Sequence, residues 1–146
     1  MVLAPQLDQA VGFRLRRAVG VADTVFAQVF ASLDVTTQQY AIIMTIQANP
    51  GCQPSALSAL MGITPNNLVP QISGLVARKY VRRSSSSKDR RIKHLWLTAA
   101  GEAFAQDLIA RHETIRARIE AHMGEEKMTE LLDLLRLYSE MPRSEG

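Results

Sequence analysis

The chain has 146 residues, 47% of them hydrophobic and 21% charged, which suits one globular domain with a hydrophobic core. Its longest apolar stretch, Ala41–Ile46, contains one Thr and is far shorter than the roughly 20 residues that span a bilayer, and no signal-peptide pattern leads the N-terminus. We therefore expect a cytoplasmic protein with no membrane partner. The single cysteine, Cys52, excludes an intramolecular disulfide, and the three histidines lack the spacing of zinc ligands, so we expect no metal and no cofactor.

The net charge of +3 is unevenly distributed along the chain. Residues 78–93 contain eight basic residues and one acidic residue, Asp89, and thus carry +7, whereas the other 130 residues carry −4. A concentrated basic segment in an otherwise mildly acidic protein is the pattern that attracts a phosphate backbone. The alternative is a solvated charged loop.

Two helices are expected in the N-terminal third of the chain. Apolar residues at steps of three and four predict an amphipathic helix over residues 6–33. Thr36 and Gln39 form a capping-box pattern, which predicts a second helix through about Ala48. Asn49-Pro50-Gly51 then ends that helix, because this combination is a strong breaker.

The next two helices are short and follow each other closely. Pro54 opens a helix that is expected to bury Leu57 and Leu60 and to end at Gly62, which serves as a C-terminal cap. Another helix is expected to begin directly after this cap, with Thr64 as N-cap and Pro65 at its first position. Two short helices joined by a tight turn with Gly predict a helix-turn-helix unit.

The second helix of this unit has one apolar stripe and one polar face. We expect a local distortion at Pro70, because its missing N–H removes one backbone hydrogen bond. The residues expected on the buried stripe are Leu68, Ile72, Leu75 and Val76. Polar residues on the remaining face, Asn66, Asn67 and Gln71, are left for contact with a partner.

The helical period disappears after Val81. The run Ser84–Ser87 predicts a flexible polar tip, and residues 92–98 form a β-prone run, so we expect a β-hairpin with a basic wing. Thr98 then caps a long helix through about His122. A last helix, from about Glu125 to Met141, has too many apolar positions for one narrow stripe, and more than one of its faces should be covered.

A helix-turn-helix followed by a basic wing predicts DNA binding. The second helix enters the major groove, and the wing contacts the minor groove or its phosphates. The residues expected to contact bases are Asn66, Asn67 and Gln71. Those expected to contact phosphates are Thr64, Arg78 and Arg83, and the wing adds Lys88, Arg90 and Arg91.

The stretch from Gln53 to Gly101 resembles the MarR family of bacterial winged-helix transcriptional regulators. The matching runs are Leu57-Ser58-x-x-Met61-Gly62-Ile63, Leu68 to Leu75, Tyr80-Val81-x-Arg83, Asp89-Arg90-Arg91, and Leu95-Trp96-Leu97-Thr98-Ala99-Ala100-Gly101. The last two carry the Asp-x-Arg and Leu-x-Leu-Thr-x-x-Gly signatures of the family. A departure is Lys79, which stands where the family usually has Gly, so we expect the turn there to differ slightly.

The resemblance implies a mainly α fold with a small β-hairpin wing (α+β). It implies a single MarR-like domain over residues 1–146, with a winged helix-turn-helix DNA-binding region at 36–97 and dimerisation helices at 6–33 and 98–141. The implied homodimer would bind a pseudo-palindromic operator in double-stranded DNA, with half-sites about 10 base pairs apart. Arg90 would insert into the minor groove, while Asp89 and Arg91 would hold the wing's shape.

By the same resemblance, a small aromatic or phenolic acid would act as effector and release a repressor from DNA. The candidate pocket residues are Arg16, Phe26, Phe30, Tyr40, Met44 and His112. Cys52 is interpreted as structural, because peroxide-sensing relatives carry their reactive cysteine in the first helix and this chain has none there. An alternative function is a winged-helix module for protein assembly that binds no operator. We expect no enzyme, since the sequence has no catalytic triad, phosphate loop or metal cluster.

Overall fold

A computed structural model describes residues 3–85 and 93–142 of the chain. The fold is mainly helical with one antiparallel two-stranded hairpin, as expected from the sequence. The elements are α1 (Pro5–Asp8), α2 (Val11–Val29), α3 (Thr37–Ala48), α4 (Pro54–Met61), α5 (Pro65–Ala77), β1 (Val81–Ser85), β2 (Lys93–Leu97), α6 (Ala99–Met123) and α7 (Glu125–Ser139). None of these helices is both long and apolar enough to cross a membrane.

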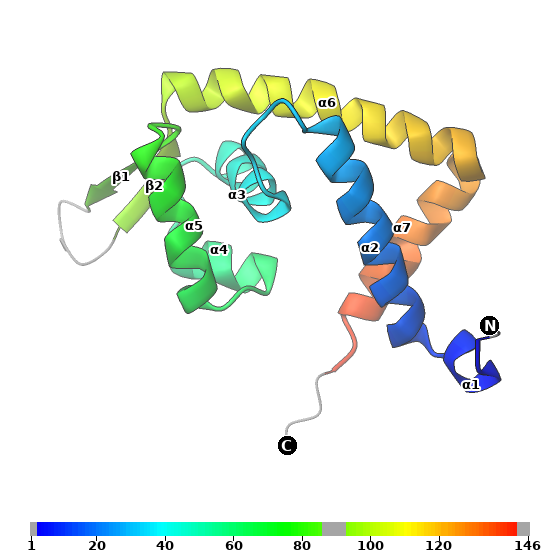
Figure 1. The fold of residues 1–146 in the computed structure, drawn as a ribbon. Coiled ribbons are helices and arrows are strands. Elements are labelled where there is room, and N and C mark those ends of the chain that lie inside the picture. The colour runs from blue at the N-terminus through cyan, green and yellow to red at the C-terminus, as the bar shows by residue number, and fades with distance from the viewer. Residues whose placement is uncertain (1–2, 86–92, 143–146) are drawn as a thin grey trace.

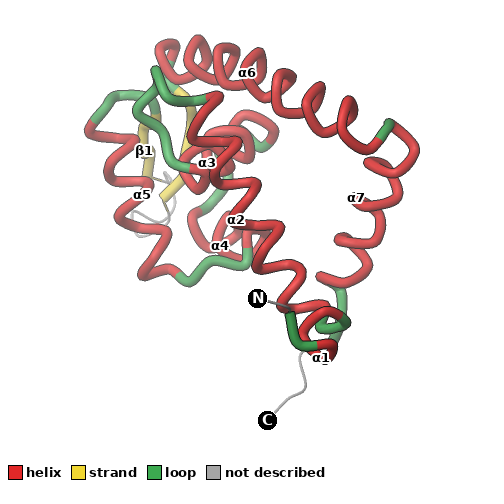
Figure 2. The backbone as a smooth tube through the Cα atoms, turned by 45° about the vertical axis from the view of Figure 1, so that its right-hand side comes forward, coloured by secondary structure: helices red, strands yellow, loops and turns green. Residues whose placement is uncertain are grey.

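The elements form two groups joined by the long helix α6. Helices α3, α4 and α5 and the hairpin gather at one end of α6, as Figure 1 shows. Helix α7 turns back from the far end of α6, and α2 and α7 lie on the side away from the hairpin (Figure 2). The molecule therefore has a compact part that carries the helix-turn-helix and a more open, purely helical part.

The hydrophobic core lies in the compact part. Helix α3 is its centre, because Ile42, Ile43 and Ile46 are all fully buried. The surrounding elements contribute one to three buried side chains each: Leu57 from α4, Leu68, Ile72 and Leu75 from α5, Val81 and Leu95 from the hairpin, and Phe104, Ala105 and Leu108 from α6.

The first long helix is shorter than expected and interrupted. Ala10 adopts an extended conformation (φ −80°, ψ 107°) between α1 and α2. Arg14 stabilises this break, since its Nε donates to the Asp8 carbonyl at 2.9 Å and its guanidinium pairs with the Asp8 carboxylate. Helix α2 then ends at Val29, and Phe30 turns into the core with only 2% of its surface exposed.

The expected helix caps form at three sites. The Thr36 side chain accepts from the Gln39 amide at 3.1 Å, and the Gln39 side chain accepts from the Thr36 amide at 3.2 Å, which completes the capping box. Gly62 adopts the left-handed conformation at the end of α4 (φ 62°). The Thr98 hydroxyl accepts from the Gly101 amide at 3.0 Å and starts α6.

Two expectations were wrong, one about the burial of Leu60 and one about the secondary structure of Ser84 and Ser85. Leu60 is 71% exposed, because α4 has only two turns and buries Leu57 alone. Ser84 and Ser85 are not in a loop but in β1, where they pair with His94 and Lys93. Interstrand hydrogen bonds determine this placement, since local propensity disfavours a strand made of serines.

Lys79 adopts the left-handed conformation that its position requires (φ 62°), so the turn after α5 keeps this geometry without a glycine. The Tyr80 amide donates to the Leu75 carbonyl at 3.0 Å and the Lys79 amide to the Val76 carbonyl at 2.9 Å. These two bonds define a Schellman motif.

Replacing Lys79 with Gly should therefore stabilise the protein. A β-carbon costs about 1–2 kcal/mol in this conformation, and the greater freedom of Gly in the unfolded chain offsets part of the gain. We expect the free energy of unfolding in urea to rise by about 0.5–1 kcal/mol. Lys79→Ala is the control, because it removes the charge but keeps the β-carbon, and an equal gain in that variant would contradict the explanation.

Candidate functional site

Helix α5 presents an accessible face at its N-terminal end. Thr64 occupies the N-cap position with Pro65 after it, but the Thr64 side chain makes no capping hydrogen bond, contrary to expectation. The Thr64 carbonyl accepts from the amides of Asn67 and Leu68, each at 3.0 Å, and this fixes the first turn. Helix α5 continues through Pro70.

The predicted base-contacting residues differ in solvent exposure. Asn66 and Asn67 are exposed, whereas Gln71 is only half-exposed and lies nearer the buried stripe. Of the apolar residues expected on that stripe, Leu68, Ile72 and Leu75 are buried, and Val76 is partly buried against the core. The polar face at the start of α5 is thus formed mainly by the two asparagines.

The hairpin is hydrogen-bonded to the segment before α4. Strands β1 and β2 pair from Val81↔Leu97 to Ser85↔Lys93. The Leu95 amide donates to the Cys52 carbonyl at 2.9 Å, which ties the hairpin to this segment. Within the hairpin, the Trp96 indole donates to the Ser84 hydroxyl at 3.0 Å.

Arg83 links the hairpin to helix α5. Its guanidinium donates to the Ser73 hydroxyl on α5 at 3.0 Å, and the rest of the side chain is exposed. The predicted phosphate contact from the hairpin and the predicted base contacts from α5 therefore lie on adjoining surfaces. The wing residues Lys88, Asp89, Arg90 and Arg91 lie outside the described residues.

Arg78, another predicted phosphate contact, is engaged within the chain. Its guanidinium lies 5.0 Å from the ring centre of Tyr80 and 5.8 Å from that of Phe104. It also lies 3.7 Å from the carboxylate of Asp34, and only 28% of the side chain is exposed. This stacking, which joins the end of α5 to α6, could not be seen in the sequence because Phe104 is 26 positions away.

The structure brings four of the predicted effector-pocket residues into one aromatic cluster: Phe26, Phe30, Tyr40 and His112. Phe26 stacks on Phe30 with ring centres 4.2 Å apart, and Tyr40 meets Phe30 edge-on at 5.7 Å. His112 on α6 stacks on Tyr40 at 5.5 Å. Phe30 belongs to the core, whereas Phe26 and Tyr40 are half-buried and His112 is exposed. The side chain of Met44, one turn after Tyr40, packs against the same core.

Arg16 does not lie in this cluster. It is exposed and precedes Phe26 by ten residues, or about 15 Å along α2. The arginine beside the cluster is Arg111, whose guanidinium donates to the Val29 carbonyl at 3.2 Å and which precedes His112 directly. Sequence reasoning missed Arg111, since its proximity arises where α6 crosses the end of α2.

Two groups near these surfaces have raised pKa values. Burial, reinforced by the negative charge of Glu113, raises the pKa of Tyr40, so its hydroxyl stays protonated at neutral pH. Burial also raises the pKa of the Cys52 thiol, although a backbone hydrogen bond partly opposes this. A thiol of raised pKa is a poor nucleophile, which supports the structural interpretation of Cys52. In the parts of the chain with described side chains, no group of three potential ligands could hold a metal ion.

A helix-turn-helix with an anchored hairpin beside it defines a winged-helix protein of the DNA-binding class. Residues 33–92 match the MarR family. The transcriptional regulator HosA of Escherichia coli is 27% identical over 103 residues, which cover 70% of this chain and 76% of HosA. The chain is therefore similar to transcriptional regulators of the MarR family, above all across the helix-turn-helix and the hairpin.

Solved structures extend the similarity to nearly the whole chain. The repressor CouR, bound to a 23-mer DNA duplex, is 28% identical, with a TM-score of 0.84 and coverage of 95% of this chain and 99% of CouR. BpsR of Bordetella bronchiseptica, whose DNA binding is regulated by 6-hydroxynicotinic acid, shares the fold at 23% identity, with a TM-score of 0.85 and coverage of 92% and 96%.

Proposed function

We propose that the chain is a homodimeric repressor that binds a pseudo-palindromic operator in double-stranded DNA and is released by a small aromatic or phenolic acid. The observation that carries this proposal is the exposed amide face of α5 beside a hairpin tied to it through Arg83 and Ser73. The relative CouR, in complex with DNA, supports the same partner.

In this proposal each group has one task. Asn66 and Asn67 contact base edges, and the half-exposed Gln71 joins them at the edge of the face. Thr64 and Arg83 position the protein on phosphates, and Arg78 does so only with the part of its guanidinium that Tyr80 and Phe104 leave open. The wing residues Lys88, Arg90 and Arg91 contact the minor groove and its phosphates, with Asp89 paired to Arg91.

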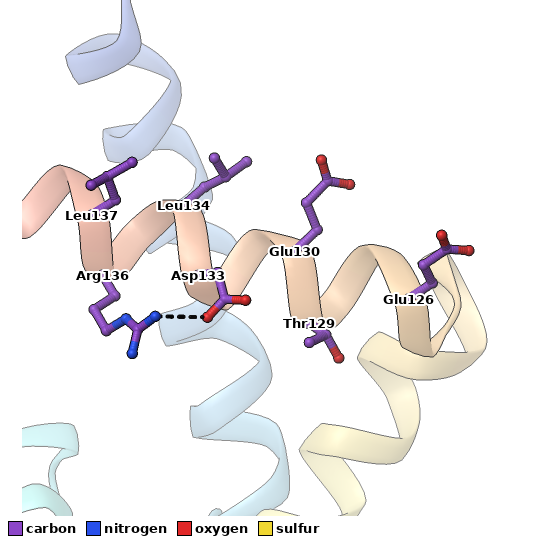
Figure 3. A pocket seen from close by; sticks show the side chains of 7 residues that line it. All are labelled: Glu126, Thr129, Glu130, Asp133, Leu134, Arg136 and Leu137. Atoms are coloured by element: carbon purple, nitrogen blue, oxygen red, sulfur yellow. Dashed lines mark hydrogen bonds and ion pairs between the residues drawn. The ribbon is translucent and has the colours of Figure 1, made fainter.

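The helical part supports a dimer. A groove of about 400 Å³ lies between the N-terminal half of α2 and the C-terminal half of α7, and its lining is almost entirely apolar. The residues that line it are Val11, Leu15, Leu134, Leu135, Leu137, Tyr138 and Met141. Figure 3 shows that Leu134 and Leu137 project in the same direction, away from the Asp133–Arg136 ion pair. A second copy would cover this surface, in keeping with dimerisation helices within 6–33 and 98–141 and a DNA-binding region at 36–97.

The decisive experiment is selection of bound sequences from a pool of random duplexes. We expect enrichment of a pseudo-palindrome with half-sites about 10 base pairs apart, and steep weakening of binding with added salt. The indole of Trp96, the only tryptophan, lies in the hairpin and gives a fluorescence signal for the same titration. A pool without an enriched sequence would contradict the proposal and favour the protein-assembly alternative.

The aromatic cluster should govern release but not binding. We expect 6-hydroxynicotinic acid or 4-hydroxybenzoic acid to release the operator, and Tyr40→Phe to raise the concentration for half-release about fivefold, because one hydrogen bond to the acid is lost. Operator affinity without the acid should stay within twofold of wild type, since the ring that packs against Phe30 is kept. Fluorescence anisotropy of labelled operator measures both quantities. An unchanged half-release concentration would remove the Tyr40 hydroxyl from the effector site.

A further inference from the structure

An apolar pair, Val69 and Pro70, lies within the accessible face of α5. Val69 is 51% exposed, and Pro70 is exposed beside it. Val69 is also not among the residues that pack against the core, in contrast to Val76 later in the same helix. No packing within the described chain therefore accounts for a β-branched apolar side chain at this position.

Helical geometry places Pro70 near the middle of the face and Val69 at its edge. Residues 66, 70 and 73 fall on one line along the helix, opposite the buried Leu68, Ile72 and Leu75. Val69 borders that line. Asn66 lies one turn before Pro70, and Ser73, which accepts a hydrogen bond from Arg83 at 3.0 Å, lies one turn after Val69. The apolar pair thus lies between the proposed base contact and the anchored hairpin.

The chemistry of the pair selects its partner. Valine has no hydrogen-bonding group, and proline has no backbone N–H to donate. A cytosine N4 amino group facing them would lose its hydrogen bonds to water without replacement. The 5-methyl group of thymine is the apolar feature of the major groove, and side chains of this kind contact it favourably.

We infer that Val69, with Pro70 beside it, reads the 5-methyl group of a thymine in each operator half-site. This inference rests on the proposed function and adds to it a specificity determinant that is apolar rather than amide-based. Val69 contacts the methyl group, and Pro70 disfavours a polar base edge, such as the cytosine N4 amino group, at the neighbouring position of the major groove.

The test starts from the operator obtained by selection. Each thymine of one half-site is replaced in turn by deoxyuridine, which removes the methyl group and nothing else. Wild-type protein should bind about fourfold more weakly when the contacted thymine is replaced, and about fifteenfold when both half-sites are changed. Val69→Ala should bind the thymine and uracil operators equally well, so that the two changes are strongly non-additive.

Leu60→Ala is the matched control, because it removes an exposed aliphatic side chain from the preceding helix and should keep the thymine-over-uracil ratio. Circular dichroism verifies that each variant is folded. Insensitivity to uracil at every position, or a sensitivity that Val69→Ala retains, would overturn the inference while leaving the proposed function intact. A selection that enriches no sequence would overturn both.

Discussion

Leu137→Asp should convert the protein into a monomer and weaken operator binding at least a hundredfold. Leu137 is 66% exposed and lies on the apolar surface between α2 and α7. A carboxylate in a dimer interface would be buried twice, once per copy, without a partner cation, and that costs more than most interfaces can offset. A monomer also loses the second half-site, whose binding is intramolecular in the dimer and strengthens the complex by orders of magnitude.

Light scattering and operator titration measure the two effects separately. The wild-type mass should be twice 16.2 kDa and the mass of the variant 16.2 kDa. Leu60→Asp places the same carboxylate on α4, at a site 71% exposed, and should leave the mass at that of a dimer. If Leu137→Asp fails to fold, Leu137→Ala remains informative, because it should weaken the dimer by about 2 kcal/mol without adding a charge. A dimer of unchanged stability in Leu137→Ala would contradict this interface.

Most features that depend on neighbouring residues were predictable from the sequence, although the expected side-chain cap of Thr64 does not form. The capping box at Thr36 and Gln39, the left-handed Gly62 and the Thr98 cap each span no more than three positions, so the local pattern contains all the partners. The accessible asparagines of α5 follow from the same logic, since a buried stripe at steps of three and four leaves the opposite face free.

Features that depend on distant residues were not predictable. Ser84 belongs to a strand because His94 pairs with it, and Arg78 stacks on Phe104 because α6 passes the end of α5. The residue types of the aromatic cluster were evident from the sequence, but the arginine beside it was not. Arg16 lies about three helical turns from Phe26, while Arg111 reaches the end of α2 from another helix.

Gly101→Ala should strongly destabilise the protein. A β-carbon built at Gly101 would lie 2.0 Å from the Tyr80 carbonyl oxygen and 3.3 Å from the β-carbon of Leu97. The Tyr80 carbonyl has little room to move, because it accepts a hydrogen bond from the Thr98 amide at 3.0 Å. Two residues of the Leu-x-Leu-Thr-x-x-Gly run thus act at the same place. Thr98 starts α6, and the absence of a side chain at Gly101 allows α6 to pack closely against the turn before β1.

We expect Gly101→Ala to lower the free energy of unfolding by about 3 kcal/mol or more, since the clash is with backbone and can be relieved only by separating α6 from the hairpin. Urea unfolding measures the loss. The control is Gly20→Ala in α2, where no atom from outside the local helix backbone lies within 4 Å of the added carbon. That variant should gain up to about 1 kcal/mol, because alanine favours a helix over glycine. The opposite signs of the two changes separate close packing from helix propensity, and a similar loss in both would contradict the role given to Gly101.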